Sequence, residues 1–326
     1  MLRAAVIGLG VGEAHAAAYA AHPDCELVAL CDIDSGRLHE VARAHPGVRT
    51  TTESLEVLRD PEIDVVSIAT YDDEHYAQVK LAVEHGKHAF VEKPLCTRPE
   101  EADDLRALLA ASPGVVVTSN LVLRASPRFR AVKELIDAGR LGTLYYCEAD
   151  YEYGRLHKIT DGWRGDLPHY SVVLGGGVHV VDLLLWLTGR RVVEATARGN
   201  RIASAGTKFR FDDFVVAILR LDDGSLAKVS ANFGSATPHF HAVTLFGTEA
   251  TFVNGLRRGV VLTRETSEPV EADYPGVEKG ALLPGFIDEV LGRGKAAVSA
   301  DEVFTALDVC FAIDEASATG ASVTLV

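Results

Sequence analysis

A glycine-rich turn near the start of the sequence has the composition of a phosphate-binding loop. Gly8-Leu9-Gly10-Val11-Gly12 follows a short apolar run and precedes an alanine-rich segment that is predicted to be helical. Glycines here let the backbone turn tightly, so that main-chain N–H groups and the helix dipole can meet the charge of a pyrophosphate. The third glycine of the G-x-G-x-x-G pattern would fall at Glu13, and Gly12 comes one place early. A merely structural strand–helix turn is the alternative.

Asp32 supplies the second element of a dinucleotide site, because it ends the second apolar run, 24 residues after Gly8. A carboxylate there accepts hydrogen bonds from the adenosine ribose hydroxyls and repels a 2′-phosphate, which favours NAD over NADP. Its neighbour Ile33 belongs to the same predicted site. Arg37 keeps NADP possible, because a nearby arginine can accommodate the 2′-phosphate. The alternative role for Asp32 is that of an Asx-turn residue.

Repeated strand–helix units are expected to position these residues. Apolar runs and helical segments alternate with short connections over residues 1–125. A run such as Asp64–Ala69 is apolar and β-branched, which is typical of a strand buried on both faces. We therefore predict an N-terminal Rossmann domain over residues 1–123, with a doubly wound parallel sheet covered by helices.

After Pro127 the pattern changes to longer alternating runs with hairpin turns. Phe214–Leu221 and Leu226–Phe233, for example, are joined by the turn residues Asp-Asp-Gly-Ser. The polar segment Glu265–Gly280 is predicted to be a mobile loop. Residues 124–326 are therefore predicted to form an α+β domain with a large open, mostly antiparallel sheet, which would bind substrate and mediate oligomerisation.

The composition fits an ordinary globular chain of 326 residues, with 48% apolar residues, five cysteines and a net charge of −14. No stripe of lysine and arginine could track phosphates, which argues against a nucleic-acid partner. The odd number of cysteines, without metal-like spacing, fits a reducing compartment. With no signal-like start and no apolar run near about 18 residues, we expect a cytoplasmic protein without membrane contact.

Four stretches together resemble a known family. They are the glycine-rich start, Ala69–His75 (ATYDDEH), Glu92-Lys93-Pro94 and Gly175–Leu187 (GGGVHVVDLLLWL). With these, the sequence resembles the Gfo/Idh/MocA oxidoreductases over nearly its whole length. The resemblance implies a Rossmann domain paired with an open-sheet domain that often forms the interface of dimers or tetramers. It also implies activity on sugars, sugar derivatives, inositols or nucleotide sugars.

The resemblance further implies roles in cofactor binding. Ala69, Thr70 and His75 would lie along the cofactor. Glu92 and Lys93 would sit beside the nicotinamide ribose and the reacting carbon. Other cofactor-side contacts would come from Asn120, Trp163 and Arg164.

By the same resemblance, His179 would be the active-site histidine on the helix that enters the substrate cleft. Many relatives carry an acid four residues earlier, and here that position is Gly175. Asp182, three residues after His179, is placed to face it on a helix. The sequence leaves open which group replaces the missing acid, and further candidates that precede His179 are Asp166, His169 and Tyr170.

Lys93 and His179 have side chains that suit the oxidation of an alcohol, which needs a base for the hydroxyl proton and stabilisation of the developing alkoxide. The Lys93 ammonium can supply positive charge beside the carbinol oxygen. A histidine, with an ordinary pKa of about 6.5, suits a base in oxidation or an acid in reduction. The alternatives are a structural lysine before a turn-forming proline and a core histidine.

His239 and His241 form an H-x-H pair on a predicted strand, so both are expected on one face. This spacing suits a metal, but no third ligand is evident nearby, and we predict no metal site. Substrate contact or a surface position is the preferred interpretation.

We therefore predict an NAD(P)-dependent dehydrogenase or reductase. It would transfer a hydride between the nicotinamide and a hydroxyl or keto carbon of a sugar, inositol or nucleotide-sugar substrate. One alternative is a non-catalytic NAD-binding sensor or accessory protein, and another is a reductase of a non-sugar carbonyl or imine. A homodimer or homotetramer through the C-terminal sheet is expected.

Overall fold

The computed structural model describes residues 1–325, which form two compact units. The first unit comprises Met1–Ala125 together with Val277–Phe304. The second comprises Ser126–Gly276 together with the residues from Thr305 onward. No helix within the described residues is both long and apolar enough to cross a membrane.

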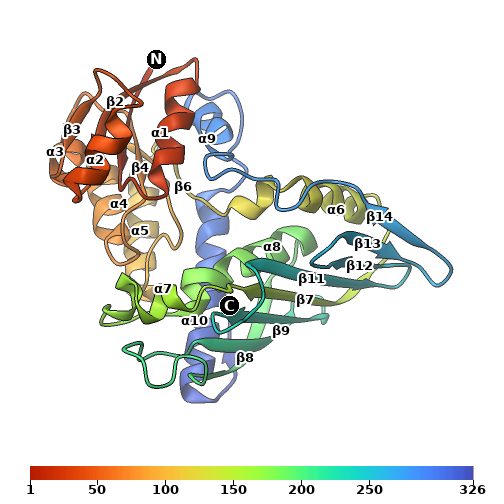
Figure 1. Ribbon diagram of the computed structural model, residues 1–326. Coiled ribbons are helices and arrows are strands. Elements are labelled where there is room, and N and C mark those ends of the chain that lie inside the picture. Colours follow the sequence, from red (N-terminus) through yellow and green to blue (C-terminus); the bar gives the residue numbers. More distant parts are fainter. Residues whose placement is uncertain (326) are drawn as a thin grey trace. The chain divides into compact units, whose positions relative to one another are not determined.

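The first unit is built on a six-stranded sheet with the order β3-β2-β1-β4-β5-β6 (Figure 1), and all its strand pairs are parallel. The strand order changes direction between β1 and β4, next to the point where dinucleotides bind in doubly wound folds. The predicted Rossmann sheet is thus confirmed. Its strands are β1 (Leu2–Ile7), β2 (Cys25–Cys31), β3 (Arg49–Thr51), β4 (Val65–Ile68), β5 (His88–Val91) and β6 (Val117–Ser119).

Helices pack against this sheet and bury the apolar strands. Every residue of β4 is buried, as expected of a central parallel strand. The short elements β3 and α3 were not predicted, because three to five residues carry too little hydrophobic period. The helical elements of the unit are α1 (Gly12–Ala21), α2 (Ser35–Ala42), α3 (Ser54–Leu58), α4 (His75–Glu84), α5 (Pro99–Ala111), η1 (Val122–Ala125) and α9 (Leu283–Val290).

The second unit is built on a nine-stranded sheet with the order β14-β13-β12-β11-β7-β10-β9-β8-β15. Only β7 and β10 pair in parallel, so the predicted open, mostly antiparallel sheet is confirmed. The prediction of a loop over residues 265–280 is wrong for Ser267–Val270. These four residues form β14, an edge strand that pairs with β13. The strands are β7 (Leu144–Glu152), β8 (Val192–Asn200), β9 (Phe214–Leu221), β10 (Leu226–Asn232), β11 (Phe240–Gly247), β12 (Thr251–Asn254), β13 (Gly259–Leu262), β14 (Ser267–Val270) and β15 (Val323–Thr324).

Alternation along β7 separates the two faces of this sheet. Cys147, Ala149 and Tyr151 are buried on the face against which α8 packs (Figure 1). The opposite face carries hydrogen-bonded polar side chains. Asp150, for example, accepts hydrogen bonds from Lys228 Nζ at 2.8 Å and from Ser230 Oγ at 2.6 Å. The sheet is therefore half core and half solvated.

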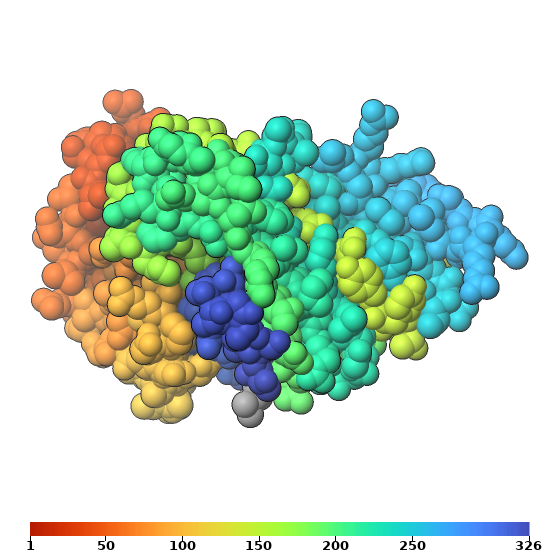
Figure 2. All heavy atoms as spheres, turned by 90° about the horizontal axis from the view of Figure 1, so that it is seen from below, coloured from red at the N-terminus to blue at the C-terminus, as the bar shows by residue number. Residues whose placement is uncertain are grey.

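The helices of the second unit are short apart from α6, α8 and α10. Its C-terminal segment closes onto the sheet, since β15 pairs with β8 and Arg198 Nη2 donates to the carbonyl of Gly320. In the space-filling view the dark-blue C-terminal segment accordingly lies beside green segments of the same unit (Figure 2). The helical elements are α6 (Pro127–Asp137), α7 (His157–Thr160), η2 (Trp163–Gly165), η3 (Val173–Gly177), α8 (Val178–Thr188) and α10 (Ala300–Thr319), of which α10 begins in the first unit.

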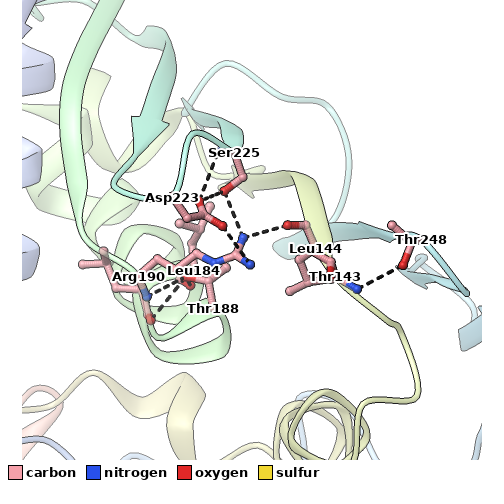
Figure 3. A network of polar contacts seen from close by, with 9 residues as sticks. Thr143, Leu144, Leu184, Thr188, Arg190, Asp223, Ser225 and Thr248 are labelled. Atoms are coloured by element: carbon pink, nitrogen blue, oxygen red, sulfur yellow. Dashed lines mark hydrogen bonds and ion pairs between the residues drawn. The ribbon is translucent and has the colours of Figure 1, made fainter.

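Arg190 anchors the C-terminal end of α8 to the sheet (Figure 3). Its Nη1 donates to the carbonyl of Leu144 at 2.7 Å and to Ser225 Oγ at 2.9 Å, and its Nη2 lies 3.0 Å from Asp223 Oδ2. The helix ends at Thr188 and is capped by Gly189, whose φ of 64° is the left-handed conformation that favours glycine. One arginine thus ties α8 to the start of β7 and to the β9–β10 turn.

Candidate active site

The turn after β1 can only be made by glycine at its first position. Gly8 has a φ of +83°, and a Cβ there would lie 2.4 Å from the carbonyl oxygen of Ala69. A Cβ on Gly12 would lie 2.8 Å from Val6 Cγ1, so the start of α1 approaches β1 closely. Around Gly10, in contrast, nothing lies within 4 Å of a Cβ position. The turn is therefore pressed against the sheet on one side and open at Gly10, as a pyrophosphate cradle requires.

Asp32 holds this turn in place. Its Oδ2 accepts a hydrogen bond from the N–H of Leu9 at 2.6 Å, and its Oδ1 accepts one from the N–H of Asp34 at 2.8 Å. The second bond closes an Asx-type turn, so Asp32 also has the structural role that is its alternative interpretation. Ile33 beside it is 75% exposed, an unusual position for a large apolar side chain.

Arg37 is engaged by protein groups at all three guanidinium nitrogens. Nε donates to the carbonyl of Leu9 at 3.0 Å, Nη1 to Glu40 at 2.7 Å and Nη2 to Glu13 at 2.5 Å. Glu13 occupies the place of the third glycine in the dinucleotide pattern, and its role as the partner of Arg37 was missed. An acid at that place together with a basic residue early in the second helix is the pattern that could have revealed the pair.

Glu92 and Asn120 are brought together at the ends of β5 and β6. Asn120 Nδ2 donates to Glu92 Oε1 at 2.6 Å and to the carbonyl of Lys279 at 2.8 Å. His15 Nε2 lies 3.5 Å from the same Glu92 oxygen. Burial by itself raises the pKa of Glu92, but hydrogen bonds from His15 and Asn120 and the charges of His15 and Lys279 lower it to about 2. Glu92 is therefore a buried, ionised hub.

Asn120 has one side-chain acceptor atom that no protein group uses among the described residues. Its Oδ1 is buried and has no hydrogen-bond partner among residues 1–325. A buried carbonyl oxygen without a donor is costly unless a bound group supplies one. The residues of the first unit therefore fit a dinucleotide at both ends, with an open cradle at Gly10 and an unused acceptor at Asn120. His15 and Lys279 were not among the predicted site residues, because nothing in their local sequence relates them to Glu92.

Lys93 follows β5 and is half-buried. The segment after it is held by His75, whose Nδ1 lies 2.6 Å from the carbonyl oxygen of Pro94 and whose Nε2 lies 3.3 Å from that of Thr70. Both neighbours are acceptors, so a ring nitrogen bonds to its carbonyl oxygen only when it carries the hydrogen. Thr70 turns its hydroxyl to Gln78 at 3.0 Å. His75 and Thr70 thus shape the backbone around Lys93.

Trp163 and Arg164 lie on η2 of the second unit. The guanidinium carbon of Arg164 stands 4.3 Å from the centroid of the Trp163 ring, in a cation–π contact. The two predicted residues contact each other, and their contact with a cofactor stays a prediction.

His179 is buried on the first turn of α8 and faces residues of the nine-stranded sheet. Its ring stacks on Tyr151 with centroids 6.1 Å apart and lies edge-on to His241 at 6.2 Å. Tyr151 and His241 are register partners on β7 and β11. His239 and His241 both contact the Tyr151 ring, at 5.2 and 5.4 Å, so they lie on one side as predicted, although β11 begins only at Phe240. Tyr151, His239 and His241 therefore form an aromatic wall beside the imidazole of His179.

Tyr274 fixes one member of this wall. Its hydroxyl accepts the N–H of His241 at 2.9 Å and lies 2.6 Å from the Nδ1 of the same residue. Burial raises the pKa of Tyr274 to about 12, so the phenol stays neutral. Sequence reasoning missed this residue, because it lies in a segment predicted to be a mobile loop.

The residues that could replace the acid missing at position 175 differ in whether they are buried or exposed. Asp166 is exposed and pairs with Lys208 at 2.7 Å. His169 is exposed against Phe211, with ring centroids 5.9 Å apart. Asp182 and Tyr170 are both buried, at 1% and 5% exposure.

Comparison with known proteins identifies the family. The family profile described as the oxidoreductase family with an NAD-binding Rossmann fold (Gfo/Idh/MocA) matches residues 2–120. The profile of the Gfo/Idh/MocA C-terminal domain matches residues 129–253. The chain belongs to the Gfo/Idh/MocA family of NAD-binding oxidoreductases, as the resemblance of its motifs predicted.

The relatives that match this sequence include inositol dehydrogenases. The chain is 29% identical to inositol 2-dehydrogenase 2 of Saccharopolyspora erythraea over 62% of its own length and 58% of that protein. It is 29% identical to scyllo-inositol 2-dehydrogenase (NAD(+)) of Bacillus subtilis over 79% of its length and 75% of that protein. The myo-inositol 2-dehydrogenase structure from Lactobacillus plantarum shares the fold, with a TM-score of 0.86, 23% identity and coverage of 100% and 99% of the two chains.

Proposed function

We propose that this protein is an NAD-dependent dehydrogenase or reductase that interconverts a hydroxyl and a keto group on a sugar, an inositol or a nucleotide sugar. The observation that carries the proposal is the buried imidazole of His179 within its aromatic wall, in a chain whose first unit carries a dinucleotide turn. An apolar wall with a few placed polar groups suits a ring with hydroxyl substituents. The named relatives that act on inositols support this class of substrate.

Cofactor binding is proposed for residues 1–123 and substrate binding for residues 124–326. The open position at Gly10 would receive the pyrophosphate, Asp32 the adenosine ribose and Asn120 the nicotinamide end. NAD is favoured over NADP, because Asp32 would repel a 2′-phosphate and Arg37 is occupied by Glu13 and Glu40. When bound, the nicotinamide supplies the hydride acceptor or donor.

Acid–base chemistry is proposed for Lys93 and His179. The Lys93 ammonium would stabilise negative charge on the carbinol oxygen, and the loop that carries it is held by His75. His179 would accept the hydroxyl proton in oxidation and return it in reduction. Tyr151 and His241 hold the imidazole plane by ring contacts.

The nine-stranded sheet is proposed as the interface of a cytoplasmic homodimer or homotetramer. Its open face exposes Ile218 and Leu226, which are 45% and 44% accessible. These apolar side chains lie among charged pairs such as Lys228–Asp150, a mixture that is common at interfaces between subunits. Sedimentation velocity at several protein concentrations tests this assembly.

A substrate screen tests the activity. Purified protein is mixed with inositols, simple sugars and UDP- or GDP-sugars in the presence of NAD or NADP, and reduced cofactor is followed by absorbance. We expect turnover with NAD and at least one polyol, and a loss of orders of magnitude in Lys93→Ala and His179→Ala. Near-normal turnover in Lys93→Ala would contradict the role proposed for the ammonium group.

A non-catalytic NAD-binding protein is the second candidate. One observation favours it, the glycine at position 175 in place of an acid. Silence with every substrate despite measurable NAD binding would select this alternative.

A further inference from the structure

The aromatic wall beside His179 continues outward along the residues that follow β7. Tyr151 of the wall stacks on His179 with ring centroids 6.1 Å apart, and Tyr153 stacks on Tyr151 at 5.8 Å. Exposure rises in the same direction, because Tyr151 is buried, Tyr153 is half-buried and Arg155 is exposed. The rings therefore lead from the proposed base to the surface of the second unit.

Phe233 and His239 enlarge the apolar surface around Tyr153. The ring centroid of Phe233 lies 4.5 Å from that of Tyr153 and 5.8 Å from that of Tyr151. His239 meets the Tyr153 ring edge-on at 5.7 Å. Rigid aromatic side chains provide a large contact area at a low cost in conformational entropy. Such a surface suits the face of a sugar ring or of a nucleobase.

A glycine turn places Arg155 at the outer end of these rings. Gly154 has a φ of +62°, and a Cβ there would collide with the carbonyl oxygen of Thr237, so only glycine fits this turn. Directly after it, the guanidinium carbon of Arg155 stands 5.6 Å from the centroid of the Tyr153 ring, in a cation–π contact. A guanidinium that lies over a ring keeps the N–H donors of its planar fork for a second partner.

Arg155 forms no ion pair with a carboxylate among residues 1–325, and the contact of its guanidinium is with the Tyr153 ring. The acids nearest to it in sequence have other partners. Glu152 accepts a hydrogen bond from Asn232 at 3.0 Å, and Asp161 accepts one from Thr160 at 3.0 Å. An exposed arginine that no acid of the chain neutralises can bind an anion from solution.

Lys158 adds a second positive charge close to Arg155. Its N–H donates to the carbonyl of Arg155 at 2.9 Å, so the two residues belong to one turn of the chain. The Lys158 side chain is exposed and likewise has no acidic partner in the part of the chain that the structure describes. The segment 155–160 contains no acid, although the chain as a whole has a net charge of −14. A local positive potential of this kind attracts negatively charged ligands.

Two rings separate the imidazole of His179 from the guanidinium of Arg155. The three successive steps between them measure 6.1, 5.8 and 5.6 Å. A sugar ring whose reacting carbon lies at His179 covers part of this distance, and a substituent that leads away from the ring must cover the rest. A phosphate or diphosphate linked to the sugar extends farther than a carboxylate bonded directly to it. The spacing therefore favours phosphate as the anion.

We propose that Arg155 is a specificity-determining residue that binds a phosphate group of the substrate. The sugar lies against the aromatic wall with its reacting carbon at His179, and its phosphate accepts hydrogen bonds from the fork of the guanidinium. The inference rests on the proposed function of His179 as the base. It narrows the substrate to a sugar phosphate or a nucleotide sugar, in preference to a neutral inositol.

The experiment is isothermal titration of the full-length protein with glucose and galactose, each as the free sugar, the 1-phosphate and the UDP-sugar. Saturating NADH is present, because it occupies the dinucleotide turn and cannot oxidise a hydroxyl. We expect at least one phosphate-bearing probe to bind about 10–100-fold more tightly than its free sugar, and added salt to weaken that binding. The 1-phosphates and the UDP-sugars distinguish the two sources of phosphate.

Variants assign the effect to the guanidinium. Arg155→Met keeps an apolar stem without the charge and is expected to remove most of the preference for phosphate, whereas Arg155→Lys is expected to keep part of it. Arg257→Met, a change at an exposed arginine between β12 and β13, is the matched control. Because both arginines are exposed, equal melting temperatures of the variants and the wild type are expected.

The outcomes separate this inference from the proposed function. Phosphate-bearing probes that bind no more tightly than the free sugars, or equal losses in Arg155→Met and Arg257→Met, overturn the proposal. Binding that depends on Arg155 without turnover of any probe with NAD refutes the proposed activity and upholds the phosphate site. Turnover of neutral inositols that is unchanged in Arg155→Met supports the activity and overturns the role of Arg155.

Discussion

Glu13 and Arg37 form an ion pair, 2.5 Å between Oε2 and Nη2, beside the turn that is expected to receive the dinucleotide. Arg37 is the basic residue beside Asp32 that a 2′-phosphate would meet, and Glu40 holds its other terminal nitrogen at 2.7 Å. The hydrogen bonds that Arg37 donates to Glu40 and Glu13 raise its pKa above the ordinary value. The pair therefore bears directly on cofactor choice.

Releasing Arg37 should improve NADP binding. In Glu13→Gln/Glu40→Gln the guanidinium loses both carboxylates and can turn toward a 2′-phosphate, so the ratio of the NADP and NAD dissociation constants is expected to fall about tenfold. Isothermal titration with each nucleotide measures it. Glu84→Gln, an exposed change at the end of α4, is the control. An unaltered ratio would show that Arg37 has no part in the discrimination.

Glu92 should make stability sensitive to acid. Its pKa is lowered from 4.5 to about 2, so the stabilisation is fully present above pH 4.5 and is lost as the pH falls toward 2. Replacing it by glutamine should cost about 2–3 kcal/mol at pH 7 and flatten this acid limb. Urea unfolding between pH 7 and pH 3 measures the effect. If Glu92→Gln and the wild type lose stability in parallel, the charged hub is absent.

The packing of Tyr151 against Gly176 predicts that a single methyl group is harmful. In Gly176→Ala the new Cβ would lie 2.3 Å from Tyr151 Cε1 and 2.9 Å from Phe233 Cε2, which should cost about 1–3 kcal/mol and disturb the ring that stacks on His179. Gly285→Ala is the matched control on α9, since its Cβ would meet nothing closer than 3.9 Å. That control should gain up to about 1 kcal/mol from helix propensity. Calorimetric melting of both variants measures these changes, and an equal melting temperature for Gly176→Ala and the wild type would contradict the close packing of Tyr151 against Gly176.

The anchor of α8 gives a paired comparison of neighbouring arginines. Arg190→Met removes bonds to Leu144, Ser225 and Asp223 and should destabilise the second unit by about 1–3 kcal/mol. Arg191→Met removes one exposed ion pair, at 3.3 Å to Asp222, and should change stability by less than about 0.5 kcal/mol. Equal losses in the two variants would contradict the anchoring role.

Local sequence patterns were enough to predict much of the fold. β5 and α5 begin and end where their apolar runs and first-turn acids indicated, and the hairpin of β9 and β10 is joined at its predicted turn. β3, α3 and β14 were missed because each is five residues or shorter and depends on a neighbouring element for its order.

The site was predictable only where its residues are close in sequence. The turn at Gly8–Gly12 and the run around Lys93 could be recognised locally. The contacts of Glu92 with His15 and of His241 with Tyr274 join residues 77 and 33 positions apart, and no local pattern encodes them.

The most direct test of the central claim is a structure of the protein with bound NAD. We expect the pyrophosphate to lie at Gly10 and the nicotinamide ring to lie next to the Lys93 ammonium group, with its carboxamide within hydrogen-bond reach of Asn120. A nicotinamide ring bound far from Lys93, or a purified protein with no measurable affinity for NAD, would contradict it.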